Sequence, residues 1–219
     1  MLTGAAGNLG RAVAAAFAGR GASLVLLDRR AGSGDTKRLW LAVDLLDARS
    51  VQAAVDQAIE RFGRIDVLCN LAGAFRMGAP VHETSAGDWD FLLGVNARTV
   101  LNTAKAVVPR MLATGGGKIV NVGAYAAQKG AAHMGAYLAS KSAVIRLTET
   151  MAAELRGRNI NVNCVLPTII DTPENRAAMP DADPDRWVAP QDLAEAIVFL
   201  ASDAARAIHG AALPVTGLS

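Results

Sequence analysis

Cysteine, aromatic residues and long hydrophobic runs are all scarce in this sequence. Its 219 residues include two cysteines, Cys69 and Cys164, and 5% aromatic residues. Two cysteines exclude a disulfide framework and a zinc site made of cysteines alone. Both lie in short apolar runs, so we expect buried, reduced thiols in a cytoplasmic protein. No apolar run approaches the ~18 residues of a membrane span, and we expect no membrane partner.

Charge of one sign is not in excess either. The chain has 22 Lys and Arg against 20 Asp and Glu, which leaves a net charge of +2. A nucleic-acid-binding face needs clustered basic residues, so we expect no nucleic-acid partner. His82, His133 and His209 lack the spacing of metal ligands, and we expect no metal site. The hydrophobic content of 52% excludes a disordered chain and fits one domain over residues 1–219.

Short apolar runs alternate with stretches of helical periodicity along the whole chain. The expected strands are residues 23–28, 39–44, 64–73, 118–123, 159–167 and 211–215. The expected helices are 86–113, 137–156, 191–202 and a stretch with Val51, Val55, Ile59 and Phe62 on one face, closed by Gly63. We therefore predict a single-domain α/β fold, a Rossmann-like, doubly wound parallel sheet with helices on both faces.

The start of the chain and the segment 171–190 depart from the regular alternation of strands and helices. Only Met1, Leu2 and Thr3 precede the first glycine turn, so either the first strand is very short or the chain begins late. The polar, proline-containing segment 171–190 is expected to form a long surface loop over the site.

The segment that follows the first strand, TGAAGNLG, is rich in glycine and leads into an alanine-rich helix. Gly4, Gly7 and Gly10 would let the backbone turn sharply, approach a pyrophosphate and pack the helix against the sheet. We expect the phosphates at the N-terminus of this helix, beside Asn8 and Leu9. A tight turn between strand and helix without a ligand is the alternative.

Acidic residues follow the next two strands. A carboxylate at Asp28 can accept hydrogen bonds from both hydroxyls of the adenosine ribose and repels a 2′-phosphate. Arg29 and Arg30 could instead pair with that phosphate, so NAD(H) is preferred and NADP(H) stays open. Asp44 and Leu45 are placed to flank the adenine, although a helix N-terminal turn would also explain them.

Tyr137 and Lys141 stand at i and i+4, on one face of an expected helix. An ammonium beside a phenol lowers the pKa of the phenol, which could then exchange a proton near neutral pH. Such pairs also occur on many helix surfaces, so the spacing alone is weak support for catalysis.

Taken in order, these features resemble the short-chain dehydrogenase/reductase family along essentially the whole chain. The resemblance implies an NAD(P)-dependent oxidoreductase in which Tyr137 is the acid/base and Lys141 holds the nicotinamide ribose and lowers the Tyr137 pKa. It implies that Asn96 holds a water in a proton relay. Further cofactor contacts implied in this way are Asn70, Ala72, Gly73, Pro167 and Thr172. The resemblance also points to a homodimer or homotetramer through the helix 86–113 and the helix that carries Tyr137.

The sequence departs from the family pattern at the residue that polarises a ketone. The family places a serine where Ala124 stands, and no Ser or Thr lies between Asn121 and Tyr137. Tyr125 and His133 lie in the loop from which a substitute donor would come. In addition, Asn8 replaces a family glycine.

The dihydropteridine reductase-like branch resembles this chain closely, because it also lacks the serine. The shared run is Leu166-Pro167, Asp171-Thr172-Pro173, Asn175-Arg176, Met179-Pro180, Asp181-Ala182-Asp183 and Trp187. This implies hydride transfer to a small unsaturated or carbonyl substrate, with a quinonoid dihydropterin-like ring as one candidate. Two alternatives stay open, a dinucleotide-binding sensor that has lost its chemistry and an ordinary ketone or alcohol dehydrogenase with a substitute for the serine.

Overall fold

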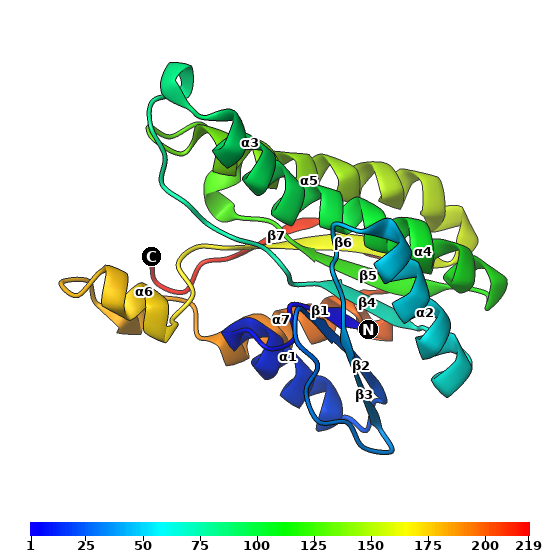
Figure 1. Cartoon of the computed structure of the whole chain (residues 1–219). Coiled ribbons are helices and arrows are strands. Elements are labelled where there is room, and N and C mark those ends of the chain that lie inside the picture. The colour runs from blue at the N-terminus through cyan, green and yellow to red at the C-terminus, as the bar shows by residue number, and fades with distance from the viewer.

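Seven parallel strands form one sheet in the computed structural model, which describes residues 1–219 (Figure 1). The strands are β1 (Leu2–Thr3), β2 (Leu24–Asp28), β3 (Arg38–Ala42), β4 (Val67–Asn70), β5 (Gly117–Val122), β6 (Ile160–Pro167) and β7 (Ala212–Val215). Their order is β3-β2-β1-β4-β5-β6-β7, which confirms the doubly wound fold. The order reverses at β1 and β4, and ligands of such sheets bind outside the carboxyl ends of the strands at this point.

Helices cover both faces of the sheet (Figure 1). One face carries α1 (Asn8–Ala18) and α7 (Pro190–Leu200), which pack against each other. The other carries α2 (Ala48–Phe62), α3 (Ala86–Leu93), α4 (Thr99–Ala113) and α5 (Gly135–Leu155). A short helix, α6 (Pro173–Ala178), stands away from the sheet on the side where the chain ends.

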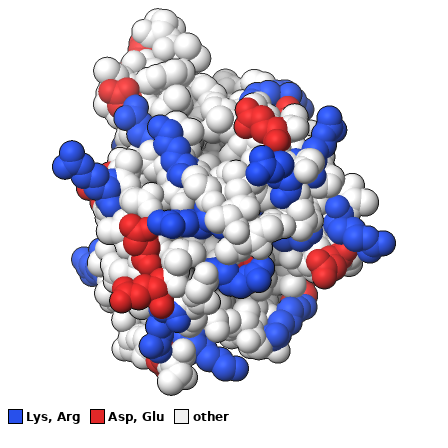
Figure 2. Space-filling model, turned by 90° about the vertical axis from the view of Figure 1, so that its right-hand side faces the viewer, with Lys and Arg blue, Asp and Glu red and all other residues white.

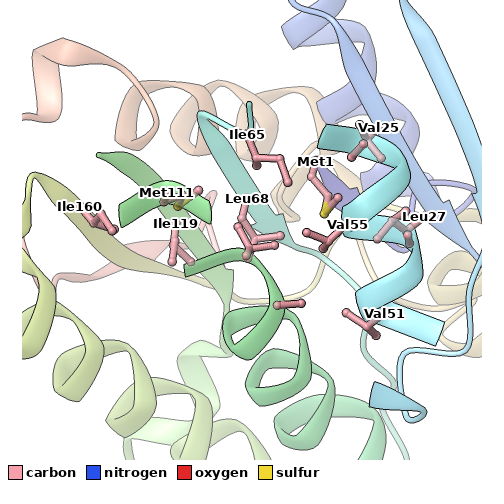
Figure 3. Packing of buried hydrophobic residues seen from close by; sticks show 14 of the residues in the cluster. Met1, Val25, Leu27, Val51, Val55, Ile65, Leu68, Met111, Ile119 and Ile160 are labelled. Atoms are coloured by element: carbon pink, nitrogen blue, oxygen red, sulfur yellow. The ribbon is translucent and has the colours of Figure 1, made fainter. Parts of the chain in front are cut away.

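The strands bury side chains on both faces, which explains their continuous apolar runs. In β2, Val25 and Leu27 point into the cluster on the α2 side, whereas Leu24 and Leu26 point into the cluster under α1 and α7. Figure 3 shows the first cluster, in which valines of α2 meet side chains of the central strands. Cys69 and Cys164 are free thiols and fully buried, as expected.

The expected helix over 86–113 contains a break in helical geometry. The turn Gly94–Arg98 between α3 and α4 is π-helical, with the Thr99 N–H bonded to the Gly94 carbonyl. A π turn accommodates one extra residue without ending the helix, so the apolar periodicity continues across it. The break places Asn96 in its middle.

The segment 171–190 is more ordered than the expected surface loop. Ile170 and Val188 form a parallel bridge at its base, and α6 and a 3₁₀ turn at Pro184–Arg186 lie between them. Thr172 caps α6 by accepting a hydrogen bond from the Asn175 N–H, and proline occupies the first helical position. Both features favour a helix start, so even this polar segment forms a short helix.

Acidic and basic side chains are interspersed on the face that Figure 2 presents. None of the helices combines the length and the hydropathy needed to cross a bilayer. No group of three or more His, Cys, Asp or Glu side chains is placed to hold a metal ion.

Candidate active site

The glycine-rich turn lies at the carboxyl end of β1, and its backbone contacts leave no room for side chains at Gly4 and Gly10. Gly4 has a φ of +65°, and a Cβ there would lie 3.0 Å from the backbone of Ala72. A Cβ on Gly10 would lie 2.8 Å from the Cα of Ala5, so glycine permits the close approach of α1. Gly7 precedes α1 as its N-cap residue without a side-chain cap, which leaves N–H groups free for an anion.

Asp28, at the end of β2, fastens this turn. Its Oδ2 accepts the Ala6 N–H at 2.9 Å, and its Oδ1 accepts the Arg29 N–H at 2.8 Å. Each carboxylate oxygen keeps a lone pair, so the predicted bonds to ribose hydroxyls remain available. Neither Arg29 nor Arg30 forms an ion pair with another residue, and both carry free charge beside the carboxylate.

A cavity of about 320 Å³ opens between this turn and the next two loops. Six of the predicted cofactor contacts line it, namely Gly4, Asp28, Asp44, Leu45, Ala72 and Gly73. Asp44 also accepts the Leu46 N–H at 2.9 Å. It therefore stabilises the turn before α2 and also lines the cavity. A glycine-rich turn at a helix N-terminus and a carboxylate in the wall of the cavity are the chemical groups that the adenosine half of a nicotinamide dinucleotide requires.

The loop after β4 joins the cavity to the catalytic residues. Thr3 Oγ1 accepts the N–H groups of Leu71 and Ala72 at 3.0 and 3.1 Å. A Cβ on Gly73 would lie 2.8 Å from Asn96 Oδ1 and 3.1 Å from Lys141 Nζ, so only glycine fits here. This glycine therefore brings the dinucleotide cavity into direct contact with two of the three predicted catalytic residues.

The side chain of Asn70 does not face the cavity. It is buried, donates to Asn121 Oδ1 and accepts from Thr103 Oγ1, both at 2.8 Å. A buried amide needs such partners, and here they come from β5 and α4. Its role in the structure is to join these elements beneath the site. Leu9 packs against the apolar cluster under α1, and Pro167 is buried at the end of β6.

Tyr137 and Lys141 lie in the first half of α5, and burial sets the pKa of both. Burial raises the pKa of Tyr137 to about 12 and lowers that of Lys141 to about 8. Lys141 Nζ donates to the Val122 carbonyl at 2.8 Å. The predicted lowering of the phenol pKa by the ammonium is therefore wrong for this structure, because loss of solvent outweighs the spacing of the two residues.

Asn96 uses both atoms of its amide, Oδ1 and Nδ2, to hold neighbouring segments. Its Oδ1 accepts the Ala74 N–H at 2.9 Å, and its Nδ2 donates to the Ala74 carbonyl and to Ser140 Oγ at 3.0 and 2.9 Å. Ser140 in turn donates to the Tyr137 carbonyl at 2.7 Å. The side chain thus connects α5 to the loop after β4.

Ala124 follows β5 and is 5% exposed within an apolar cluster that includes Ala127, Leu138 and Ile145. The nearby Ser142 hydroxyl is already donated to the Ala127 carbonyl at 2.9 Å. His133 lines a small cavity of about 90 Å³ together with Tyr137. Of the two substitutes named from the sequence, His133 lines this cavity with Tyr137, whereas Tyr125 does not line it.

The segment 171–190 reaches back to the phosphate turn. Glu174, in the first turn of α6, accepts a hydrogen bond from Asn8 Nδ2 at 2.7 Å, and Asn8 Oδ1 accepts one from Arg11. Asp171 forms a two-pronged ion pair with Arg176 at 2.6 and 2.8 Å. Thr172 stands at the start of this helix, where its hydroxyl is the cap.

A comparison with known proteins gives this arrangement a family. The family model described as enoyl-(acyl carrier protein) reductase matches residues 4–217. The chain is 39% identical to D-threitol dehydrogenase of Mycolicibacterium smegmatis, over 99% of this chain and 90% of that protein. It is 37% identical to cis-4-hydroxycyclohexanecarboxylate dehydrogenase of Sinomonas cyclohexanicum, over 99% of this chain and 94% of that protein. The chain belongs to the short-chain dehydrogenase/reductase family.

A solved structure agrees with the fold and contains a nicotinamide dinucleotide. The crystal structure of NAD⁺-bound xylitol dehydrogenase has a TM-score of 0.88 and 28% identity, over 99% of this chain and 96% of that one. This short-chain dehydrogenase/reductase is therefore an oxidoreductase that uses a nicotinamide dinucleotide. The broader resemblance is confirmed, whereas the comparisons do not single out the dihydropteridine reductase-like branch.

Sequence reasoning missed several residues of this short-chain dehydrogenase/reductase that position the site. Thr3 and Ser140 lie within motifs that had been recognised, but their bonds to the loop after β4 and to Asn96 depend on the fold. Phe75 packs its ring edge-to-face on Tyr137, with centroids 4.9 Å apart and an interplanar angle of 88°. The available signal was an aromatic residue two positions after Gly73, in a chain with few aromatic residues.

Proposed function

We propose that this enzyme transfers a hydride between NAD(H) and a small unsaturated substrate, with a proton supplied by Tyr137. The observation that carries the proposal is the pairing of a complete Tyr137, Lys141 and Asn96 set with an alanine at position 124. Bound NADH supplies the hydride. The protein supplies a proton donor but no hydroxyl to stabilise a developing alkoxide, which suits a conjugated acceptor such as a quinonoid dihydropterin-like ring.

The protonation state of the two catalytic groups supports the reductive direction. With a pKa of about 12, the Tyr137 phenol keeps its proton at neutral pH and is ready to act as a general acid. With a pKa of about 8, Lys141 is cationic at pH 7, and its Nζ lies next to the position a Gly73 side chain would take. There it is placed to donate to a ribose hydroxyl of the dinucleotide.

Oxidation of an alcohol or reduction of a simple ketone is the second candidate. His133 lines the same small cavity as Tyr137 and would replace the serine as hydrogen-bond donor. The names of two relatives, D-threitol dehydrogenase and cis-4-hydroxycyclohexanecarboxylate dehydrogenase, describe oxidation of hydroxyl groups. In this case the phenol must lose its proton first, so activity would rise with pH.

A spectrophotometric screen separates the two candidates. NADH oxidation is followed at neutral pH with quinonoid dihydropterin, a quinone and simple ketones, and NAD⁺ reduction with sugar alcohols and cyclic alcohols. The proposal expects the conjugated rings to react fastest. Faster turnover of ketones or alcohols than of every ring would favour the second candidate.

The cofactor preference rests on Asp28. We expect NADH to bind more tightly than NADPH, because the Asp28 carboxylate would face the 2′-phosphate of NADPH. In Asp28→Ser the unpaired Arg29 and Arg30 can bind that phosphate, so the preference narrows or reverses. Titration calorimetry with both cofactors measures this, with Asp35→Ser as an exposed control in the loop after β2. Tighter binding of NADPH by the unmodified enzyme would contradict the assignment.

We further propose that the enzyme is a cytoplasmic homodimer or homotetramer. Leu101 of α4 is 42% exposed and Trp89 of α3 is 44% exposed. An open groove of about 500 Å³ between Val81, Trp89 and Ala139 continues this apolar face along α5. Such a face favours burial against a second copy. Light scattering at micromolar concentration should give a multiple of 22.7 kDa, and a monomer mass would count against the assembly.

A further inference from the structure

Phe75 is the exposed aromatic side chain nearest to the chemistry. Its side chain is 54% exposed, although its ring contacts the largely buried ring of Tyr137 at 4.9 Å between centroids. In the loop after β4, Phe75 stands between Ala74, which lines the dinucleotide cavity, and Arg76, which lines the small cavity beside Tyr137. Its edge-to-face contact places the ring beside the phenol.

The backbone on both sides of Phe75 is anchored. On one side, Asn96 holds the N–H and the carbonyl of Ala74 at 2.9 and 3.0 Å. On the other, Arg76 donates to Asp88 at 3.0 Å, and its guanidinium lies 3.9 Å from the centroid of the Phe91 ring. A mobile loop would let Phe75 turn inward and bury its ring. The anchors instead hold an apolar ring exposed, and such preorganisation favours ligand binding.

The same anchors connect Phe75 to the catalytic tyrosine. Asn96 donates to Ser140, and Ser140 donates to the Tyr137 carbonyl, so one chain of contacts fixes both rings relative to each other. Ala124 adds no hydroxyl to the site. Phe75 therefore offers an aromatic surface beside the phenol in a site that lacks the family serine.

We propose that Phe75 is a specificity-determining residue that forms the wall of the substrate site and selects flat, conjugated rings over acyclic carbonyl compounds. This inference rests on the proposed function and names its substrate class. Aromatic rings pack on one another with a preference worth about 0.5–1.5 kcal/mol beyond buried area. The upper end of this range corresponds to a change of roughly tenfold in affinity for the ring.

The decisive experiment compares Phe75→Leu and Phe75→Ala with Phe199→Leu, which changes an aromatic residue on α7 that is 44% exposed. We expect the Phe75 variants to lose roughly tenfold in kcat/KM for a bicyclic quinone such as menadione, mainly through KM. Their kcat/KM for the acyclic 2,3-butanedione should change by less than about twofold, and NADH affinity by calorimetry should be unchanged. An equal loss on both substrates, or a loss confined to kcat, would overturn the proposal.

A binding measurement keeps this test independent of turnover. Titration of menadione into the NAD⁺ complex, in which no reduction occurs, should show saturable binding that weakens roughly tenfold in Phe75→Ala and not in Phe199→Leu. If menadione binds in this way but no ring is reduced, the proposed reaction fails and the role of Phe75 stands. Absence of menadione binding to the unmodified enzyme, or equal binding to Phe75→Ala, overturns the proposal itself.

Discussion

Tyr137→Phe lowers turnover roughly 10²–10⁴-fold on every acceptor, while the affinity for NADH stays nearly unchanged. This is the range that a positioned general acid contributes, and the substitution removes only the proton donor. The Tyr137 hydroxyl makes no hydrogen bond within the chain, so its loss leaves the packing against Phe75 and the fold intact. Steady-state kinetics and NADH calorimetry on the same preparation measure both effects.

The chain provides its own control for this prediction. Tyr125 is the only other tyrosine, it is 42% exposed, and it lies one residue after Ala124. Tyr125→Phe should keep full turnover if Tyr137 is the acid. If Tyr137→Phe keeps its activity and Tyr125→Phe loses it, then Tyr125 is the proton donor. The assignment of Tyr137 as the acid would then be wrong.

Ala124→Ser raises the reduction of simple ketones by about 10²-fold and leaves the reduction of conjugated rings almost unchanged. A well-placed donor to a developing oxyanion is worth roughly 10²–10³-fold, and a ring that needs no such donor gains nothing. Ala124 is buried among apolar side chains, so the new hydroxyl should also lower the free energy of unfolding by about 1–3 kcal/mol. Acceptor kinetics and thermal melts measure these two effects.

A serine at a second buried alanine is the control that separates the gain in ketone reduction from the loss of stability. Ala127 lies in the same apolar cluster and is 8% exposed. Ala127→Ser should be destabilised to a similar degree without any gain on ketones. If the unmodified enzyme already reduces ketones as fast as rings, His133 or another donor has replaced the serine, and the argument from Ala124 is wrong.

Much of the fold could be predicted because its signals are local. Apolar runs buried on both faces mark parallel strands, and Gly63 ends α2 with a φ of +78°, as its position after the apolar stripe indicated. The π turn at Gly94–Arg98 has no comparable signal, because it continues the helix instead of ending it. The short helix α6 was missed for a related reason, since its capping residues lie in a polar, proline-containing segment.

The residues of the candidate site could largely be predicted from the sequence, whereas the pKa values of its catalytic groups could not. The six predicted residues that line the dinucleotide cavity are glycines, acids and small apolar residues within recognisable motifs. The pKa values of Tyr137 and Lys141 depend on how much solvent each loses, which residue spacing does not contain. The packing of Phe75 on Tyr137 brings together the loop after β4 and helix α5, so only the folded chain reveals it.

Asn8 donates a hydrogen bond to Glu174, so the affinity of the phosphate turn for the cofactor and the position of α6 depend on each other. An anion that enters the phosphate turn meets a carboxylate already bonded there, and repulsion between like charges favours release of α6. By reciprocity, whatever holds α6 against the turn weakens the affinity of the turn for anions by the same factor. Since the contact is exposed to solvent, added salt should weaken this coupling.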